Sequence, residues 1–256
     1  MEVHHHPHVE KKSIKEYLLE GLMIFLAVSL GFLAESFREY RTEHERAKEY
    51  ASEMLSDLRS DSADLIAYSA YFNYAANNID TLIQLLTQAD AQQVPPGKLY
   101  WYGLWGGARR SFVPHDATLN QMKSSGSLRY FTNSALSREV AQYDQLCRSM
   151  ETVETREQGV YTEVRKTRAL IFQFKFNEAA NNIAQANRVF VNQARIDSFI
   201  QSNPPLLTTD KIILNQYVEL IRSRYIKLKV SSADTVMQHA TQLITDLKKE
   251  YDLEIE

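Results

Sequence analysis

The residues with the clearest chemical potential are four histidines near the N-terminus, His4, His5, His6 and His8, out of seven in the chain. Neutral imidazoles are ligands for Zn, Ni and Cu, and this close spacing lets several of them reach one ion. The tail is therefore the candidate site for a divalent metal. The alternative is a solvated polar tail that binds no metal in the cell, because no cysteine or carboxylate cluster completes a preorganised site.

A second candidate region is the aromatic segment, residues 99–112, which holds both tryptophans, Trp101 and Trp105, together with Arg109 and Arg110. These four residues suit contact with a protein partner, an aromatic ligand or the membrane interface. The simpler interpretation is an aromatic plug at the end of a helical bundle, because Trp and Tyr bury a large area while keeping a polar group available.

Elsewhere the sequence holds no arrangement typical of an active site. Cys147 is the one cysteine, which excludes an intrachain disulfide and a zinc site built on several cysteines. His115 and Asp116 are neighbours without a third group to orient them, and Asp116 is expected to cap a short helix over 117–123. The Ser/Gly turn at 124–127 lacks the spacing of a phosphate-binding P-loop. We therefore expect a protein that is not an enzyme, and we assign no catalytic residues.

The apolar stretch Tyr17–Phe37 predicts a transmembrane helix. No charged residue lies between Gly21 and Ala34. Eighteen predominantly apolar residues span about 27 Å as a helix, close to the hydrocarbon thickness of a bilayer. The alternatives are a cleaved signal peptide and a buried core helix. The sequence thus divides into a His-rich tail (1–16), a transmembrane helix (17–37) and a helical bundle domain (38–256), with Ser13 as a suitable N-cap for the first helix.

Small residues recur along one side of the predicted span, at Ala27, Gly31 and Ala34. Such a stripe allows close approach of a second helix backbone within the membrane. The alternative is the ordinary composition of a membrane helix. The stripe favours a homo-oligomer, or association with other membrane-protein subunits, in the lipid bilayer.

Two stretches carry a resemblance to a known family. The first is HHHPH followed by KEYLLEGLMIFLAVSLGFLAESFREY, and the second is LNQMKSSGSLR at 119–129. Together they resemble an uncharacterised family of single-pass membrane proteins from Bacteroidota, whose second motif reads approximately LKSSGNLR. Met122 and Ser127 depart from that motif, where the family has Leu and Asn. The resemblance implies a membrane anchor and a helical domain in a bacterial inner membrane, and it implies no catalytic residues.

Charge on the two sides of the span gives little guidance to its orientation. Residues 1–16 contain three lysines, and residues 35–50 contain four basic side chains. A short lysine-bearing tail before an uncleaved span usually stays inside. We therefore expect a cytoplasmic N-terminus and a periplasmic helical domain.

The remainder of the chain predicts an all-α fold. Apolar residues make up 44% of the sequence, and there are only 8 Gly and 6 Pro. Apolar residues recur at steps of three and four in a helix that continues from the span to just before Val94, in a second that opens at Asn133, and in a third capped by Thr209 or Asp210. Residues 172–202 add a short or bent fourth helix. An antiparallel bundle of three to four long helices is expected.

These observations favour a non-enzymatic, membrane-anchored helical scaffold, or an accessory subunit of a bacterial envelope complex. One alternative is an extracytoplasmic sensor that binds a ligand in its bundle, and another is a metal-binding accessory protein. The overall charge of −3 does not point to a nucleic-acid partner.

Overall fold

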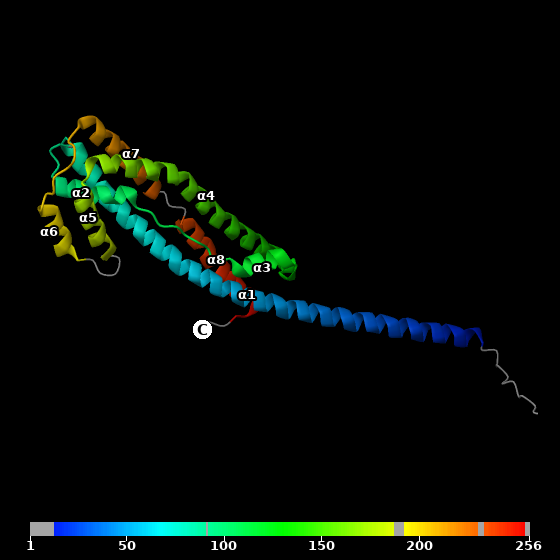
Figure 1. Cartoon of the computed structure of the whole chain (residues 1–256). Helices are drawn as coiled ribbons and strands as arrows, with labels where there is room; N and C mark the ends of the chain where they lie inside the picture. The colour runs from blue at the N-terminus through cyan, green and yellow to red at the C-terminus, as the bar shows by residue number, and fades with distance from the viewer. Residues whose placement is uncertain (1–12, 91, 187–191, 230–232, 254–256) are drawn as a thin grey trace, which may run out of the picture.

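The computed structural model describes residues 13–90, 92–186, 192–229 and 233–253. Within these ranges the fold is all-α, as expected, and contains no strand. The elements in chain order are α1 (Ile14–Gln88), α2 (Pro96–Leu104), η1 (Trp105–Gly107), α3 (Ala117–Ser125), η2 (Ser127–Tyr130), α4 (Ser134–Ile171), α5 (Phe174–Ala186), α6 (Gln193–Gln201), α7 (Lys211–Lys229) and α8 (Ala233–Tyr251), where η denotes a short 3-10 helix. Figure 1 shows a bundle from which the first part of α1 projects.

Helix α1 is continuous over 75 residues, about 110 Å at 1.5 Å per residue. Its start is fixed by a capping box, in which the Ser13 side chain accepts a hydrogen bond from the backbone of Glu16 and the Glu16 side chain accepts one from the backbone of Ser13. Neither glycine nor proline occurs between Gly31 and Gln88, so the sequence offers no helix breaker beyond the predicted span. The expected rod from the span into the bundle is therefore confirmed.

The N-terminal part of α1 is the one helix among the described residues that is long and apolar enough to cross a membrane. None of this apolar window is buried, so the alternative of a buried core helix is wrong. Ala27, Gly31 and Ala34 all lie on the exposed surface. The first buried side chain along α1 is Ala47, and from there the same helix enters the core.

The bundle has two apolar clusters along its length. The cluster closer to the projecting part of α1, called the nearer cluster, combines α1 residues such as Leu58 with Val140 of α4 and Leu243 of α8. The cluster at the other end of the bundle, called the farther cluster, combines Ile79 of α1 with the end of α4, the aromatic segment and α7. Tyr68 packs against both clusters and joins them.

Helices α7 and α8 run antiparallel to α1 and pack against both α1 and α4. Helix α4 runs in the same direction as α1, because the segment 108–116 returns along the bundle before α3 and α4 begin (Figure 1). The predicted third long helix is two helices, α7 and α8. Asp210 caps α7 as expected, accepting hydrogen bonds from the backbone N–H groups of Ile212 and Ile213 at 2.9 and 3.0 Å.

The structure also tests the predictions for residues 172–202 and for the end of the short helix α3. Residues 172–202 form two short helices, α5 and α6, instead of one. Helix α3 ends at Gly126, whose φ of 72° is the left-handed conformation expected of a glycine after a helix.

Candidate functional site

The structure separates the four candidate residues of the aromatic segment. Trp101 and Trp105 are buried, with 2% and 7% of their surface exposed, whereas Arg109 and Arg110 are exposed. Trp101 packs in the farther apolar cluster. Trp105 and Arg109 line a large cavity, and Arg110 lines a smaller neighbouring one. The segment is therefore a packed plug, as the simpler interpretation expected, and one side of it faces a cavity.

Two glycines fix the position of Trp105. A Cβ atom on Gly103 would lie 2.7 Å from the hydroxyl of Tyr217, and one on Gly106 would lie 2.8 Å from Ile221. Only glycine allows α7 to approach this backbone so closely, and the Tyr217 hydroxyl donates a 2.7 Å hydrogen bond to the carbonyl of Gly103. Because these contacts hold the backbone on both sides of Trp105, its indole has a defined place in the fold.

The large cavity lies among η1, α4 and α5 and has a volume of about 560 Å³. We call it the arginine cavity, because its lining includes Arg109, Arg165 and Arg168. The guanidinium groups of Arg109 and Arg165 lie 5.7 and 5.8 Å from the ring centroid of Tyr161, within the range of a cation–π contact. Positive charge is thus gathered around one aromatic ring at the mouth of the cavity.

Arg168 is the buried arginine of this cavity, with 8% of its surface exposed. One terminal nitrogen donates to the carbonyl of Leu104 at 3.3 Å, and the other donates to the side-chain oxygen of Asn177. Its Nε atom is buried and has no hydrogen-bond partner in the part of the chain that the structure describes. Burial lowers the pKa of Arg168, and the nearby charge of Arg165 acts in the same direction.

A second buried arginine provides a comparison. Arg224 of α7 forms an ion pair of 2.8 Å with Glu157 of α4 and donates a further 2.8 Å hydrogen bond to the carbonyl of Ala108. Its charge is therefore matched inside the protein. The Nε atoms of both arginines lack a partner among the described residues. Arg168 differs in having no carboxylate partner there: it donates to two neutral oxygens, and its guanidinium carbon lies 5.6 Å from the ring centroid of Phe172.

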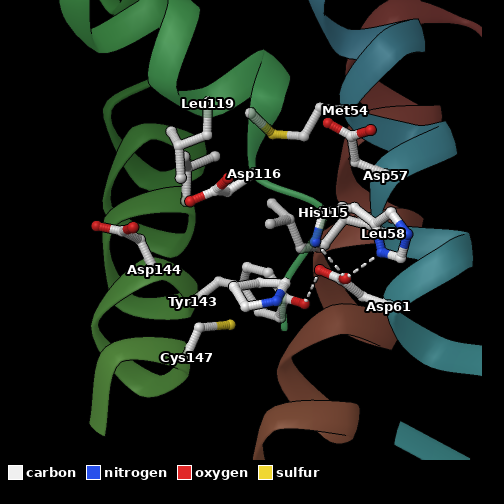
Figure 2. A pocket seen from close by; sticks show the side chains of 13 residues that line it. Met54, Asp57, Leu58, Asp61, His115, Asp116, Leu119, Tyr143, Asp144 and Cys147 are labelled. Atoms are coloured by element: carbon white, nitrogen blue, oxygen red, sulfur yellow. Dashed lines mark hydrogen bonds and ion pairs between the residues drawn. The ribbon is translucent and has the colours of Figure 1, made fainter. Parts of the chain in front are cut away.

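A separate polar centre surrounds Asp61 of α1, which is 1% exposed. Its carboxylate accepts a 2.7 Å hydrogen bond from the backbone N–H of His115, a 2.9 Å bond from Nδ1 of the same residue, and a 2.6 Å bond from the Tyr143 hydroxyl. Figure 2 shows Asp61 between these two side chains, with Cys147 beside Tyr143. The associated cavity of about 30 Å³ has room for a water molecule but not for an organic ligand.

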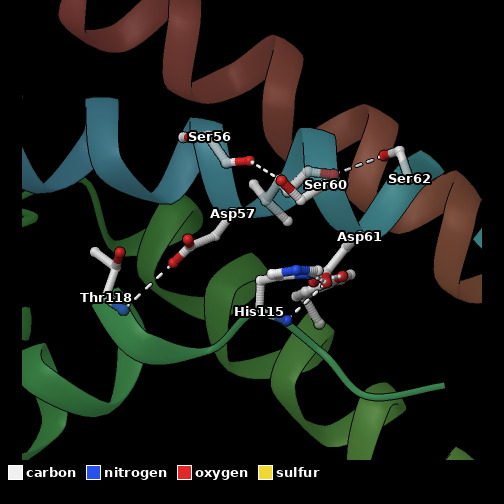
Figure 3. Close-up of polar contacts among 9 residues, drawn as sticks. Ser56, Asp57, Ser60, Asp61, Ser62, His115 and Thr118 are labelled. Atoms are coloured by element: carbon white, nitrogen blue, oxygen red, sulfur yellow. Dashed lines mark hydrogen bonds and ion pairs between the residues drawn. The ribbon is translucent and has the colours of Figure 1, made fainter. Parts of the chain in front are cut away.

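Asp57, one helical turn before Asp61, holds the next element in place. Its carboxylate accepts a 3.3 Å hydrogen bond from the backbone N–H of Thr118, at the start of α3 (Figure 3). Asp116 occupies the N-cap position but makes no capping hydrogen bond, so its predicted capping contact is wrong. The cap comes from α1 instead. Asp57 and Asp61 thereby attach the returning segment and α3 to α1.

The polar centre does not present an activated nucleophile. Burial raises the pKa of the Cys147 thiol to about 12, so this group is not a thiolate at neutral pH. Burial also raises the pKa of Tyr143. His115 is oriented by a buried carboxylate, a partner that the sequence analysis did not assign to it. The arrangement of Asp61, His115 and Tyr143 joins α1, the returning segment and α4.

The predicted metal ligands His4, His5, His6 and His8 lie outside the described residues. Among the residues that the structure describes, no group of three or more His, Cys, Asp or Glu side chains is arranged to hold a metal ion.

Comparison with protein families, curated proteins and solved structures finds no match to this chain. The resemblance to the Bacteroidota membrane family therefore stays an expectation from the two sequence stretches. Function is inferred from the geometry of the chain itself.

Proposed function

We propose that this protein is a non-enzymatic membrane anchor that holds a helical bundle beside the bilayer, as a scaffold or accessory subunit of a bacterial envelope complex. The observation that carries the proposal is the continuity of α1. One end of this helix is an exposed apolar rod, and the other end is part of the bundle core. A single unbroken helix would hold the bundle at a fixed distance from the membrane span.

The distances along α1 support a bundle close to the membrane. About ten residues separate Phe37, the end of the predicted span, from Ala47, the first buried residue, and they would cover about 15 Å as a helix. The exposed ion pair of Arg41 with Glu45 lies in this interval, and that of Arg38 with Glu35 joins the interval to the end of the predicted span. Charged side chains at this position suit the boundary between lipid headgroups and water. In the proposed orientation the N-terminus is cytoplasmic and the bundle is periplasmic.

The small-residue stripe supports association inside the membrane. A Cβ atom added to Gly31 meets no other atom within 4 Å, so this surface of the helix is open to a neighbour. The neighbour is a second copy of the chain or another membrane subunit. An accessory role agrees with the polar centre, where the buried groups join elements and the thiol is held protonated.

The test is the mass and composition of the native particle. The full-length untagged protein is solubilised gently from its native membrane, and the particle is weighed and its chains are identified. The proposal expects release only with detergent and a particle larger than one chain. Release by salt or alkaline washing would exclude the anchor, and a monodisperse single chain would exclude the scaffold.

A further inference from the structure

The inference concerns the arginine cavity and does not depend on the membrane anchor, because every lining residue belongs to the bundle. Arginine stays protonated in proteins, and a charge removed from water normally has an ionic partner or a full set of hydrogen bonds. Arg168 has no ionic partner within the described chain: its Nε atom has no acceptor, its two bonded oxygens are neutral, and its guanidinium carbon lies 5.6 Å from the Phe172 ring centroid. Its position is therefore one that an anion would stabilise.

A buried tryptophan, Trp105, lines the same cavity. The indole Nε1 of Trp105 is buried and has no partner among the described residues. Its ring is held by Tyr74 and Trp101, with centroids 4.8 and 6.1 Å away in edge-on arrangements. Protein atoms cover this nitrogen, so the indole contributes to the wall of the cavity without offering a donor to it. The donors of the cavity are the guanidinium groups of Arg168, Arg165 and Arg109, and clustered guanidinium groups suit an anion.

The remaining lining gives the chemical class of the ligand. Arg165 and Arg109 add positive charge at exposed positions, and Glu178 is the one carboxylate among the described residues of the lining. A volume of about 560 Å³ is typical of sites for small organic molecules and far exceeds that of an inorganic ion. Tyr161 and Trp105 supply aromatic surface next to the charges. The lining therefore suits a small-molecule ligand that carries an anionic group on an aromatic ring or another apolar group.

We propose that the arginine cavity binds a small organic anion, whose carboxylate or phosphate group lies among Arg168, Arg165 and Arg109. Arg165 and Arg109 attract the ligand at the mouth, and Arg168 completes its charge pair when the ligand enters. Carboxylates and phosphates share the planar or forked acceptor geometry that arginine recognises.

The two tryptophans provide the measurement. The protein in detergent micelles is isotope-labelled at the indole nitrogens for NMR spectroscopy. The Trp105→Phe variant assigns the indole N–H signals of Trp101 and Trp105. Four probes are titrated: benzoate, phenyl phosphate, inorganic phosphate and the neutral benzamide. We expect benzoate or phenyl phosphate to shift the Trp105 signal in a saturable manner while Trp101 changes little. The stronger of the two identifies the anionic group.

Matched variants assign the effect to the charge. Arg168→Met is expected to weaken binding of the effective probe at least tenfold and to lower the melting temperature of the free protein less than Arg224→Met does, because the bonds it loses go to neutral oxygens and not to a carboxylate. Arg224→Met, the matched variant, is expected to lower the melting temperature because it leaves Glu157 without this arginine. Should Arg168→Met fail to fold, the exposed Arg165→Ala replaces it, with a weaker but measurable loss of affinity.

Four outcomes would overturn the proposal. They are no response to benzoate or phenyl phosphate, an equal response to benzamide, full binding after removal of the Arg168 charge, and binding of inorganic phosphate as tight as that of either organic anion. The proposed scaffold is tested by particle mass, so the failure of one inference leaves the other standing.

Discussion

At the scale of single residues, the buried ion pair between Arg224 and Glu157 gives the sharpest stability prediction. Arg224→Met removes one partner of a pair in which both side chains are largely buried, at 6% and 13% exposure. We expect a loss of about 3 kcal/mol in the free energy of unfolding, because the variant removes the charge-assisted bond to Glu157 and the bond to the carbonyl of Ala108 from a largely buried site. Urea titration of the full chain in detergent measures it.

The control for this substitution is Arg222→Met, on the exposed surface of the same helix. It removes the same charge and adds the same side chain without breaking the pair with Glu157. Equal losses from the two variants would show that the ion pair does not contribute to stability.

His115 predicts a pH-dependent contribution to stability. Its hydrogen bond to Asp61 raises its pKa above the ordinary value of 6.5, and the carboxylates of Asp64 and Asp57 act in the same direction. A raised pKa in the folded state stabilises the fold fully below the pKa of the unfolded state, and the stabilisation is lost as the pH rises through the folded value. The imidazolium therefore contributes at pH 5.5 and not at pH 9.

His115→Gln isolates this contribution, because glutamine keeps a neutral donor near Asp61. The difference in free energy of unfolding between the wild type and this variant is expected to be larger at pH 5.5 than at pH 9, by an amount on the order of 1 kcal/mol for this partly exposed ion pair. Denaturant titrations at the two pH values measure it. A difference that is equal at both values would assign His115 a purely neutral contact.

From the histidine tail we predict that the protein carries a bound metal, and that substitution of the histidines removes it. Untagged protein purified without chelating resins is expected to carry a divalent metal, and replacement of His4, His5, His6 and His8 by alanine is expected to abolish it. Elemental analysis of both proteins measures the ratio of metal to chain. Unchanged metal in the substituted protein would contradict the prediction.

Residue types alone identified part of the candidate sites. The presence of Trp105 and Arg109 in one short aromatic segment was sufficient to select them. Arg168 was missed because it belongs to a charged run on α4 that is typical of a solvated face, and its burial depends on Leu104 and on α5. Asp61 was missed although a signal exists: it falls between Leu58 and Leu65 on the apolar side of α1, where a carboxylate is unexpected.

At the scale of elements, helix starts were predictable in part, since the capping contact expected of Asp116 is absent and other expected caps are present. Ser13, Asn133 and Asp210 all form the expected caps, because capping uses only nearby residues in the chain. The division between α7 and α8 was not predicted, because the apolar spacing continues across it. Asp57 capping α3 was also beyond prediction, since it lies 61 positions from Thr118.

The predicted span provides a matched test of helix association. Gly31→Ile fills the stripe with Ala27 and Ala34, and Gly21→Ile adds the same side chain on another side of the same helix. Neither glycine has other atoms within 4 Å, so both variants keep the chain's own contacts. We expect Gly31→Ile to weaken association at least tenfold and Gly21→Ile to leave it nearly unchanged.

Crosslinking in membranes or sedimentation in detergent micelles measures this difference. Equal association of the wild type and both variants would remove the stripe from the contact, and would direct attention to the bundle surface instead.

At the scale of the whole molecule, composition and periodicity were sufficient to predict an all-α bundle on a projecting helix. They were not sufficient to predict its topology. The direction of α4 relative to α1 depends on the course of residues 108–116. This segment is not helical, so it has no apolar periodicity from which its course could be predicted. Its course is set by contacts such as those of His115 with Asp61 and of Phe112 with Glu154, which only the fold brings together.

The packing of α8 on α1 has a consequence for biosynthesis. Helix α1 carries the apolar span and is made long before α8, so the positions of α1 that pack on α8 in the nearer cluster stay uncovered until α8 has been made. In the proposed orientation, the chain would be tethered at the translocation channel while that face is uncovered. Premature termination before α8 would leave an inserted protein with an open apolar face, a natural substrate for envelope proteases and chaperones.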